Sequence, residues 1–188
     1  MKNAIYFIGG ASASGKSVAA RKLVAGDGRA IIELDNFYDI LASALADHVI
    51  LEKVTGKIAA EAVIQLLAAN AFCLVEGGWI DPSRASKLKD KSEGRFYPVY
   101  CGYAHGKVKE RLRIIKNGKN HWLAEQSGKA ARDFLRSQIE LSRWYRKQCE
   151  KYALPFFDFS SVEEGMAALV ADYGRWQAAT RAAPPAVS

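Results

Sequence analysis

Five short apolar segments are spaced along the chain, and longer stretches with helical periodicity separate them. The segments are nearly continuous in apolar residues, as expected for strands that are buried on both faces of a parallel sheet. Pro98 lies inside the fourth segment, and because proline lacks a backbone N–H, we expect that strand to start only at Val99. The expected strands are Ala4–Ile8, Ala30–Leu34, Ala71–Val75, Phe96–Cys101 and Pro155–Phe159.

Helical patterns lie between these segments. Apolar side chains recur on one helical face in Lys57–Asn70, and the pattern of Val162–Thr180 begins after two serines with the spacing of a capping box. The alternation of strands and helices predicts an α/β fold, a three-layer α/β/α sandwich around a mostly parallel five-stranded sheet. We expect one domain over residues 1–181 and a disordered tail over 182–188, with the sequence AAPPAVS.

The most distinctive motif directly follows the first apolar segment. Gly10–Ser17 reads GASASGKS and fits the pattern G-x-x-x-x-G-K-[ST] at every fixed position. Glycines let the backbone wrap a phosphate chain, and the loop amides and the positive end of the following helix attract the anion. We expect Lys16 to reach the outer phosphates and the Ser17 hydroxyl to hold Mg²⁺. The predicted nucleotide-binding residues are Gly10, Ala11, Ser12, Ala13, Ser14, Gly15, Lys16, Ser17 and Val18.

An acidic segment, ELDNFYD at 33–39, follows the second predicted strand. Ligands bind beyond the carboxyl ends of the strands in a parallel sheet, and Asp35 lies at that edge. A carboxylate there can orient a substrate hydroxyl or accept its proton as it attacks the γ-phosphate. The alternative is structural, with Asp35 or Asn36 capping a helix that begins near Phe37.

The third predicted strand ends in an acid and two glycines, in the sequence FCLVEGGW at 72–79. A carboxylate at this position, here Glu76, is typical of a Walker B motif, which reaches Mg²⁺ from the strand end. The alternative is that Glu76 merely ends the strand. Trp79 is a candidate for lining a substrate pocket, and an indole packed in the core or at an exposed edge fits the sequence equally well.

These three motifs, in this order, resemble those of the small P-loop kinases of the nucleoside and nucleotide kinase group, such as uridine kinases, nicotinamide riboside kinases and phosphoribulokinases. The resemblance implies a P-loop NTPase fold with a short lid, here at about 116–129. In that group the lid region carries basic side chains that close over the phosphates. The candidates for clamping the γ-phosphate are Arg111, Arg113, Lys116 and Lys119, although the paired lid arginines of nucleotide kinases are not obvious at their usual spacing.

Composition and charge limit the kinds of partner and the cellular setting that we expect. The net charge of +7 is explained by phosphate substrates, and we find no zinc-finger, helix-turn-helix or RNA-binding motif, so a nucleic-acid partner is not expected. No apolar run approaches the ~20 residues that cross a bilayer. Three scattered cysteines suit buried free thiols in a reducing cytoplasm. We expect His48, His105 and His121 to be surface or lid residues, since none has a carboxylate partner at ligand spacing.

We interpret the chain as a cytoplasmic kinase that uses ATP and Mg²⁺ to phosphorylate a hydroxyl or phosphate of a small molecule. ATP is preferred over GTP because the sequence lacks an NKxD-type guanine reader. The alternatives are a nucleotide-dependent switch or regulatory ATPase, and a toxin-like or antibiotic-modifying kinase of the same fold. Neither the acceptor nor the oligomeric state follows from the sequence, because variable helices form the acceptor pocket in this fold. The expected catalytic residues are Lys16, Asp35, Arg111 and Arg113, with Ser17 and Glu76 at the metal.

Overall fold

The computed structural model describes residues 4–26, 28–117 and 122–182 of the chain. Its strands form one sheet in the order β2-β3-β1-β4-β5, and every registered pair is parallel. The predicted strands are thereby confirmed, with ends that differ by one or two residues. The strands are β1 (Ile5–Gly10), β2 (Ile31–Glu33), β3 (Cys73–Glu76), β4 (Phe96–Gly102) and β5 (Phe156–Asp158).

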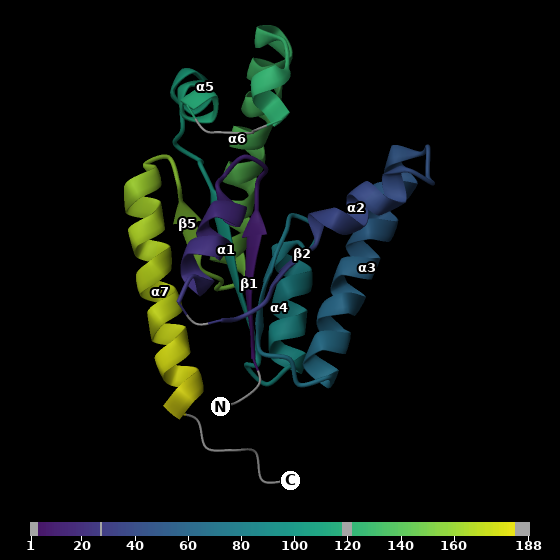
Figure 1. Ribbon diagram of the computed structural model, residues 1–188, viewed down its shortest axis with the longest axis vertical. Coiled ribbons are helices and arrows are strands. Elements are labelled where there is room, and N and C mark those ends of the chain that lie inside the picture. Colours follow the sequence, from purple (N-terminus) through teal and green to yellow (C-terminus); the bar gives the residue numbers. More distant parts are fainter. Residues whose placement is uncertain (1–3, 27, 118–121, 183–188) are drawn as a thin grey trace.

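Helices cover both faces of the sheet, as Figure 1 shows. One core cluster joins Ile5 and Phe7 of β1 to α3, α4 and α6, and the other joins Tyr6 and Ile8 to α1 and α7. Because successive side chains of β1 point to opposite, equally buried faces, the strand is apolar at every position. The predicted three-layer α/β/α sandwich is confirmed. The helices are α1 (Lys16–Val24), α2 (Asp35–Ala42), α3 (His48–Ala68), α4 (Pro82–Lys91), α5 (Val108–Asn117), α6 (Gly128–Lys151) and α7 (Val162–Ala182), with a 3₁₀ turn at Trp122–Glu125.

The expected start of β4 at Val99 is wrong, because the strand begins at Phe96 and includes Pro98. β5 pairs with β4 only from Tyr100 onward, and the N–H of Tyr100 donates to the β5 side. Alternate residues of a strand direct their N–H groups to the same neighbour. The nitrogen of Pro98 therefore points to the same side of β4 as β5, but it lies before the point where β5 begins. Its missing N–H thus costs no hydrogen bond between strands.

Two further expectations differ from the structure at helix ends. The predicted helix Lys57–Asn70 begins earlier, at His48, where the Asp47 side chain accepts from two backbone N–H groups of the first turn. Ala182, expected in a disordered tail, is the last residue of α7. The remainder of that tail lies outside the described residues.

A third cluster of buried side chains lies at the carboxyl end of the sheet. It joins Ala11 and Tyr103 to α5 and to the first half of α6, the helices at the top of Figure 1. The predicted lid connects these two helices. Residues 118–121 of that lid lie outside the described ranges. Within the described ranges, no helix combines the length and apolar character needed to cross a membrane.

Candidate functional site

The motif GASASGKS forms the turn from β1 into α1. Gly10 has a φ of 124°, and a Cβ at this position would collide with the backbone of Cys101 on β4. Gly15 is the N-cap of α1 in the left-handed conformation, with a φ of 96°. Both positions therefore require glycine, and the turn leaves the amino end of α1 facing the carboxyl edge of the sheet.

Three side chains hold successive carbonyl groups of this phosphate loop. Lys16 Nζ donates to the Ala11 carbonyl at 3.0 Å, and Arg111 Nη2 donates to the Ala13 carbonyl at 2.8 Å. The Tyr103 hydroxyl donates to the Ser12 carbonyl at 3.0 Å. Since the C=O and N–H of a trans peptide point in opposite directions, each of these bonds also orients the N–H of the following loop residue. The loop is thus shaped before any anion binds.

Ser17 and Glu76 meet next to the loop. The Ser17 hydroxyl donates to Glu76 Oε1 at 2.8 Å, and Glu76 is 2% exposed at the end of β3. Burial raises the pKa of Glu76 above its ordinary value, although Lys16 and the Ser17 hydrogen bond oppose this shift. Glu76 Oε2 has no hydrogen-bond partner among the described residues.

This pair of side chains fits a magnesium ion. Mg²⁺ keeps several waters and takes few protein oxygens, and a hydroxyl beside a buried carboxylate with a free oxygen supplies such ligands. In the described part of the chain, no cluster of three or more His, Cys, Asp or Glu side chains offers an all-protein metal site. The residues at Ser17 and Glu76 thus suit a metal that is shared with phosphates.

Asp35 does not cap α2. It is the first residue of the helix, and Leu34 is the N-cap. No side chain of the cap makes a capping hydrogen bond. Instead, Asp35 Oδ1 accepts from the N–H of Gly78 at 3.3 Å, which joins the end of β2 to the turn after β3. The carboxylate is exposed at the same edge as the phosphate loop. The capping alternative is therefore wrong, and the side chain is available to a ligand.

Aromatic side chains flank Asp35. Tyr38 and Trp79 stack with their ring centroids 4.8 Å apart and an interplanar angle of 9°. The Tyr145 hydroxyl, from α6, donates to the carbonyl of Gly78 at 3.2 Å. Trp79 is half-buried, so it lies at the border between core and surface on the acceptor side.

The basic residues predicted to clamp the γ-phosphate lie in different environments. Arg111 is 4% exposed, spans the carbonyls of Ala13 and Phe159, and lies over the Tyr103 ring at 4.3 Å. Burial holds its pKa below the ordinary value. Arg113 and Lys116 are exposed on α5, and Lys119 lies outside the described residues. Of the three that the structure describes, Arg111 has a hydrogen bond to the phosphate loop, and the clamping roles stay predictions.

Sequence reasoning missed a charged cluster at the other end of the loop. His105 is exposed, as expected for a surface residue, but its Nδ1 lies 2.6 Å from Asp158 Oδ2, a carboxylate partner that is distant in sequence. Arg146 Nη1 lies 2.9 Å from His105 Nε2. Burial acts to raise the pKa of Asp158, but hydrogen bonds from Ser160 and His105 outweigh it and hold that pKa below its ordinary value. His105 and Asp158 are 53 positions apart in the sequence, so no local spacing indicates that they form a pair.

Four buried polar side-chain atoms of the described residues have no hydrogen-bond partner. All four belong to residues of this site, and a buried polar atom without a partner costs about 1–3 kcal/mol unless a ligand or water supplies one. These atoms are therefore free to bond a ligand or an ordered water at this site. The atoms are Ser14 Oγ, Glu76 Oε2, Trp79 Nε1 and Arg111 Nε.

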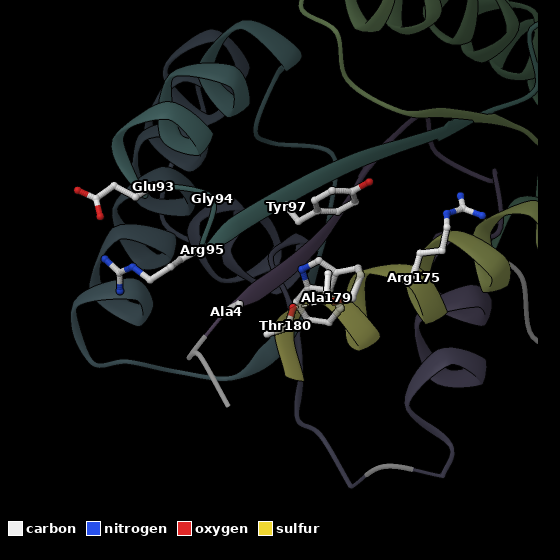
Figure 2. A pocket seen from close by; sticks show the side chains of 9 residues that line it. Ala4, Glu93, Gly94, Arg95, Tyr97, Arg175, Ala179 and Thr180 are labelled. Atoms are coloured by element: carbon white, nitrogen blue, oxygen red, sulfur yellow. Dashed lines mark hydrogen bonds between the residues drawn. The ribbon is translucent and has the colours of Figure 1, made fainter. Parts of the chain in front are cut away.

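A cavity of about 410 Å³ lies at the opposite end of the sheet, between the start of β4 and α7. In Figure 2 the side chains of Arg95 and Arg175 extend to opposite sides of it. Arg95 donates to the Leu67 carbonyl, and the Thr180 hydroxyl donates to the Trp176 carbonyl. These two polar side chains are thus engaged within the protein, and the phosphate loop remains the candidate site.

Comparison with known proteins supports the same architecture. No family model and no curated protein matches the chain. A shikimate kinase from Bacteroides thetaiotaomicron superposes with a TM-score of 0.62 at 11% identity, over 93% of this chain and 98% of that one. A gluconokinase from Sinorhizobium meliloti gives 0.56 at 17%, over 93% and 98%. A shikimate kinase from Acinetobacter baumannii, in complex with shikimate, gives 0.51 at 17%, over 95% and 94%. At such low identities the likeness concerns the fold alone, and the chain has the fold of small P-loop kinases.

Proposed function

We propose that this protein is an ATP-dependent kinase that transfers the γ-phosphoryl group to a hydroxyl or phosphate of a small molecule. The acceptor class is nucleoside-like, sugar-like or another metabolite. The observation that carries the proposal is the position of Asp35, a carboxylate exposed beside the phosphate loop and bound to the turn that follows Glu76. A nucleotide-binding loop alone fits many functions, whereas a free carboxylate on its acceptor side suits transfer to a hydroxyl.

On the nucleotide side, the roles follow from the charges and dipoles at the loop. Lys16 and the amides at the start of α1 stabilise the β- and γ-phosphates and the charge that develops between them. Lys16 leaves the Ala11 carbonyl, which it contacts in this structure, to do so. Ser17 and Glu76 would hold Mg²⁺, which supplies electrophilic neutralisation of the phosphate oxygens when bound.

On the acceptor side, Asp35 orients the incoming hydroxyl and takes its proton. A bond forms between the acceptor oxygen and the γ-phosphorus, and the bond to the bridging oxygen of ADP breaks. The hydrogen bond from Gly78 N–H fixes one carboxylate oxygen and leaves the other for the acceptor. The stacked Tyr38 and Trp79 are proposed to border the acceptor pocket. We also infer a reducing, cytoplasmic setting from the three buried free thiols.

The test starts with a panel of small hydroxyl compounds, scored for acceptor-dependent ATP consumption and phosphorylated product. With the best acceptor, Asp35→Asn should lower kcat by about 10²-fold or more, in line with general-base contributions. ATP affinity and melting temperature should not change, because Asp35 does not cap α2. The exposed Asp39→Asn, one helical turn on, is the matched control and should retain parental transfer.

Two outcomes would overturn the proposal. Full transfer activity in Asp35→Asn would refute the role of Asp35. ATP hydrolysis by the parent that no acceptor accelerates would favour the nucleotide-dependent switch instead.

A further inference from the structure

The first half of the phosphate loop is fastened to the helix that follows the predicted lid. The backbone N–H of Ser12 donates to Gln138 Oε1 at 2.9 Å, and Gln138 lies on α6. Its neighbours Leu135 and Ile139 are buried in the cluster that contains Ala11. Packing therefore fixes this turn of α6 beside the loop, within hydrogen-bond reach of the Gln138 side chain.

The two ends of the loop face different parts of the site. At the strand end, a Cβ on Gly78 would lie 3.5 Å from the Gly10 carbonyl oxygen, and the N–H of Gly78 is bound to Asp35. At the helix end, a Cβ on Gly15 would lie 3.9 Å from the ring of Phe159, after β5. Ser12 belongs to the half that faces Asp35. If the acceptor binds beside Asp35, as the proposed function has it, this half of the loop is the half nearer to the acceptor.

The side-chain amide of Gln138 has unused hydrogen-bonding capacity. The atom that faces the Ser12 N–H must be the amide oxygen, because only an acceptor can bind a donor there. The Nε2 group then presents two N–H donors, and no described residue accepts from them. Neutral donors aimed at a site where negative charge collects are an efficient way to bind and stabilise that charge.

We propose that Gln138 recognises the γ-phosphoryl group of the nucleotide, donating from Nε2 to a γ-phosphoryl oxygen while Oε1 holds the Ser12 N–H in place. This inference deepens the proposed function and rests on it for the nature of the nucleotide. It makes α6 the element that distinguishes ATP from ADP.

The test compares the affinities for ADP and for a non-hydrolysable ATP analogue, both with Mg²⁺, by titration calorimetry. In Gln138→Glu the carboxylate still accepts from Ser12 but cannot donate, and it adds a negative charge beside the γ-phosphoryl group. The ratio of analogue affinity to ADP affinity should fall by about tenfold or more, with ADP affinity unchanged. Ser137→Ala is the matched control, because its exposed hydroxyl bonds only the Phe134 carbonyl. It should leave both affinities at the parental values.

A pH series tests whether the group at position 138 lies close enough to act on the γ-phosphoryl group. When protonated, the carboxyl group introduced by Gln138→Glu both accepts and donates, as the amide does. The affinity ratio of this variant, divided by that of the parent, should therefore recover as the pH falls through the carboxyl range. Because repulsion by the introduced charge alone gives the same loss and recovery, the neutral variant Gln138→Ala separates the two roles. A role limited to holding the Ser12 N–H predicts an unchanged affinity ratio in Gln138→Ala. A parental ratio in Gln138→Glu at neutral pH would overturn the inference.

Two safeguards keep the result interpretable. If the melting curve shows that Gln138→Glu does not fold, Gln138→Ala decides, with a loss of a few-fold in the ratio expected and an unchanged ratio contradicting the inference. If the parent binds ATP but phosphorylates no acceptor, the proposed kinase activity is overturned. The ratio of analogue affinity to ADP affinity still tests the role of Gln138. A parent that binds neither nucleotide overturns both proposals.

Discussion

The two sides of the candidate site are built differently. On the nucleotide side, Lys16 and Arg111 are 6% and 4% exposed, and each bonds a carbonyl of the phosphate loop. On the acceptor side, α2 buries none of its residues, and Ile40 and Val49 are 67% and 76% exposed. One side is packed and hydrogen-bonded like a protein interior, and the other presents apolar side chains to solvent.

This difference separates two tasks of the proposed kinase. Phosphates look alike in every nucleotide, so the groups that bind them gain most from being fixed in advance. An acceptor pocket that closes only around its substrate excludes water at the moment of transfer. In the proposed kinase, the rigid side would bind the nucleotide and stabilise transition-state charge, and the open side would determine the specificity for the acceptor.

Lys16→Ala should have the largest effect of the changes considered. It removes the cation that serves the outer phosphates, and phosphoryl transfer should fall by about 10³-fold or more. The fold should persist, because the side chain makes its hydrogen bond only to the loop itself. Lys22→Ala, an exposed lysine on the same helix, is the control for a loss of positive charge. Equal turnover in Lys16→Ala and the parent would contradict the assignment of the loop.

Arg111 and Arg113 offer a matched pair on α5. Arg111→Ala removes hydrogen bonds to Ala13 and Phe159 and a contact with the Tyr103 ring, and it should lower the free energy of unfolding by about 2–4 kcal/mol. ATP affinity should fall with it, because the loop loses a support. Arg113→Ala, at an exposed position, should change stability by less than about 0.5 kcal/mol. Calorimetry of both variants, with and without ATP, measures these effects.

The measurements on either variant could contradict the role assigned to that arginine. A parental melting temperature and ATP affinity in Arg111→Ala would show that the loop does not depend on this side chain. A hundredfold loss of kcat in Arg113→Ala, with ATP affinity unchanged, would assign the clamping role to Arg113 rather than to Arg111.

The fold could be predicted from the sequence because its determinants are local. Each apolar segment is a strand, buried on both faces in β1, β3 and β4 and half-buried at the edge strands β2 and β5. GASASGKS specifies the turn from β1 to α1 through Gly10 and Gly15. The errors arose where tertiary context overrides local preference. Pro98 is tolerated because β5 is short, and the first turns of α3 expose Val49 and Ile50, which obscures the amphipathic pattern.

The site was predictable only in its local motifs. Lys16, Ser17, Glu76 and Asp35 lie in recognisable segments next to strand ends. The side chains that shape the loop from other elements are far away in sequence, with Tyr103 91 positions and Gln138 126 positions from Ser12. A tyrosine directly after an apolar strand and a glutamine on a helix have no signature of their own. Only the folded chain brings them to the loop.

Glu76→Gln should reveal a conflict between function and stability. Burial raises the pKa of Glu76, so the folded state holds the proton more tightly than the unfolded state. Stability is therefore lost as the pH rises from the ordinary carboxyl range through the raised pKa, and the loss persists at neutral pH. Without Mg²⁺, Glu76→Gln should melt at a higher temperature than the parent at neutral pH and at a similar temperature in acid.

The same variant should respond less to Mg²⁺, in both melting temperature and transfer rate, because the amide carries no charge to attract the cation. Ser17→Ala is the companion variant, since it removes the hydroxyl but leaves the carboxylate. Identical Mg²⁺ activation curves for Glu76→Gln and the parent would show that Glu76 is structural. A melting temperature below that of the parent at neutral pH would contradict the sign of the pKa shift.

The smallest effect is expected on the open side, and it tests the comparison directly. Val49→Ser changes a side chain that is 76% exposed, so it removes little buried area and should alter the free energy of unfolding by less than about 0.5 kcal/mol. Leu51→Ala, in the same helical turn but 1% exposed, should cost about 2–5 kcal/mol. Chemical denaturation of the two variants gives both values. If the exposed apolar side chains of α2 and α3 close over the acceptor, Val49→Ser should raise the KM for the acceptor several-fold and leave the KM for ATP unchanged. A destabilisation of Val49→Ser close to that of Leu51→Ala would mean that Val49 is buried in solution, and the division into a packed and an open side would fail.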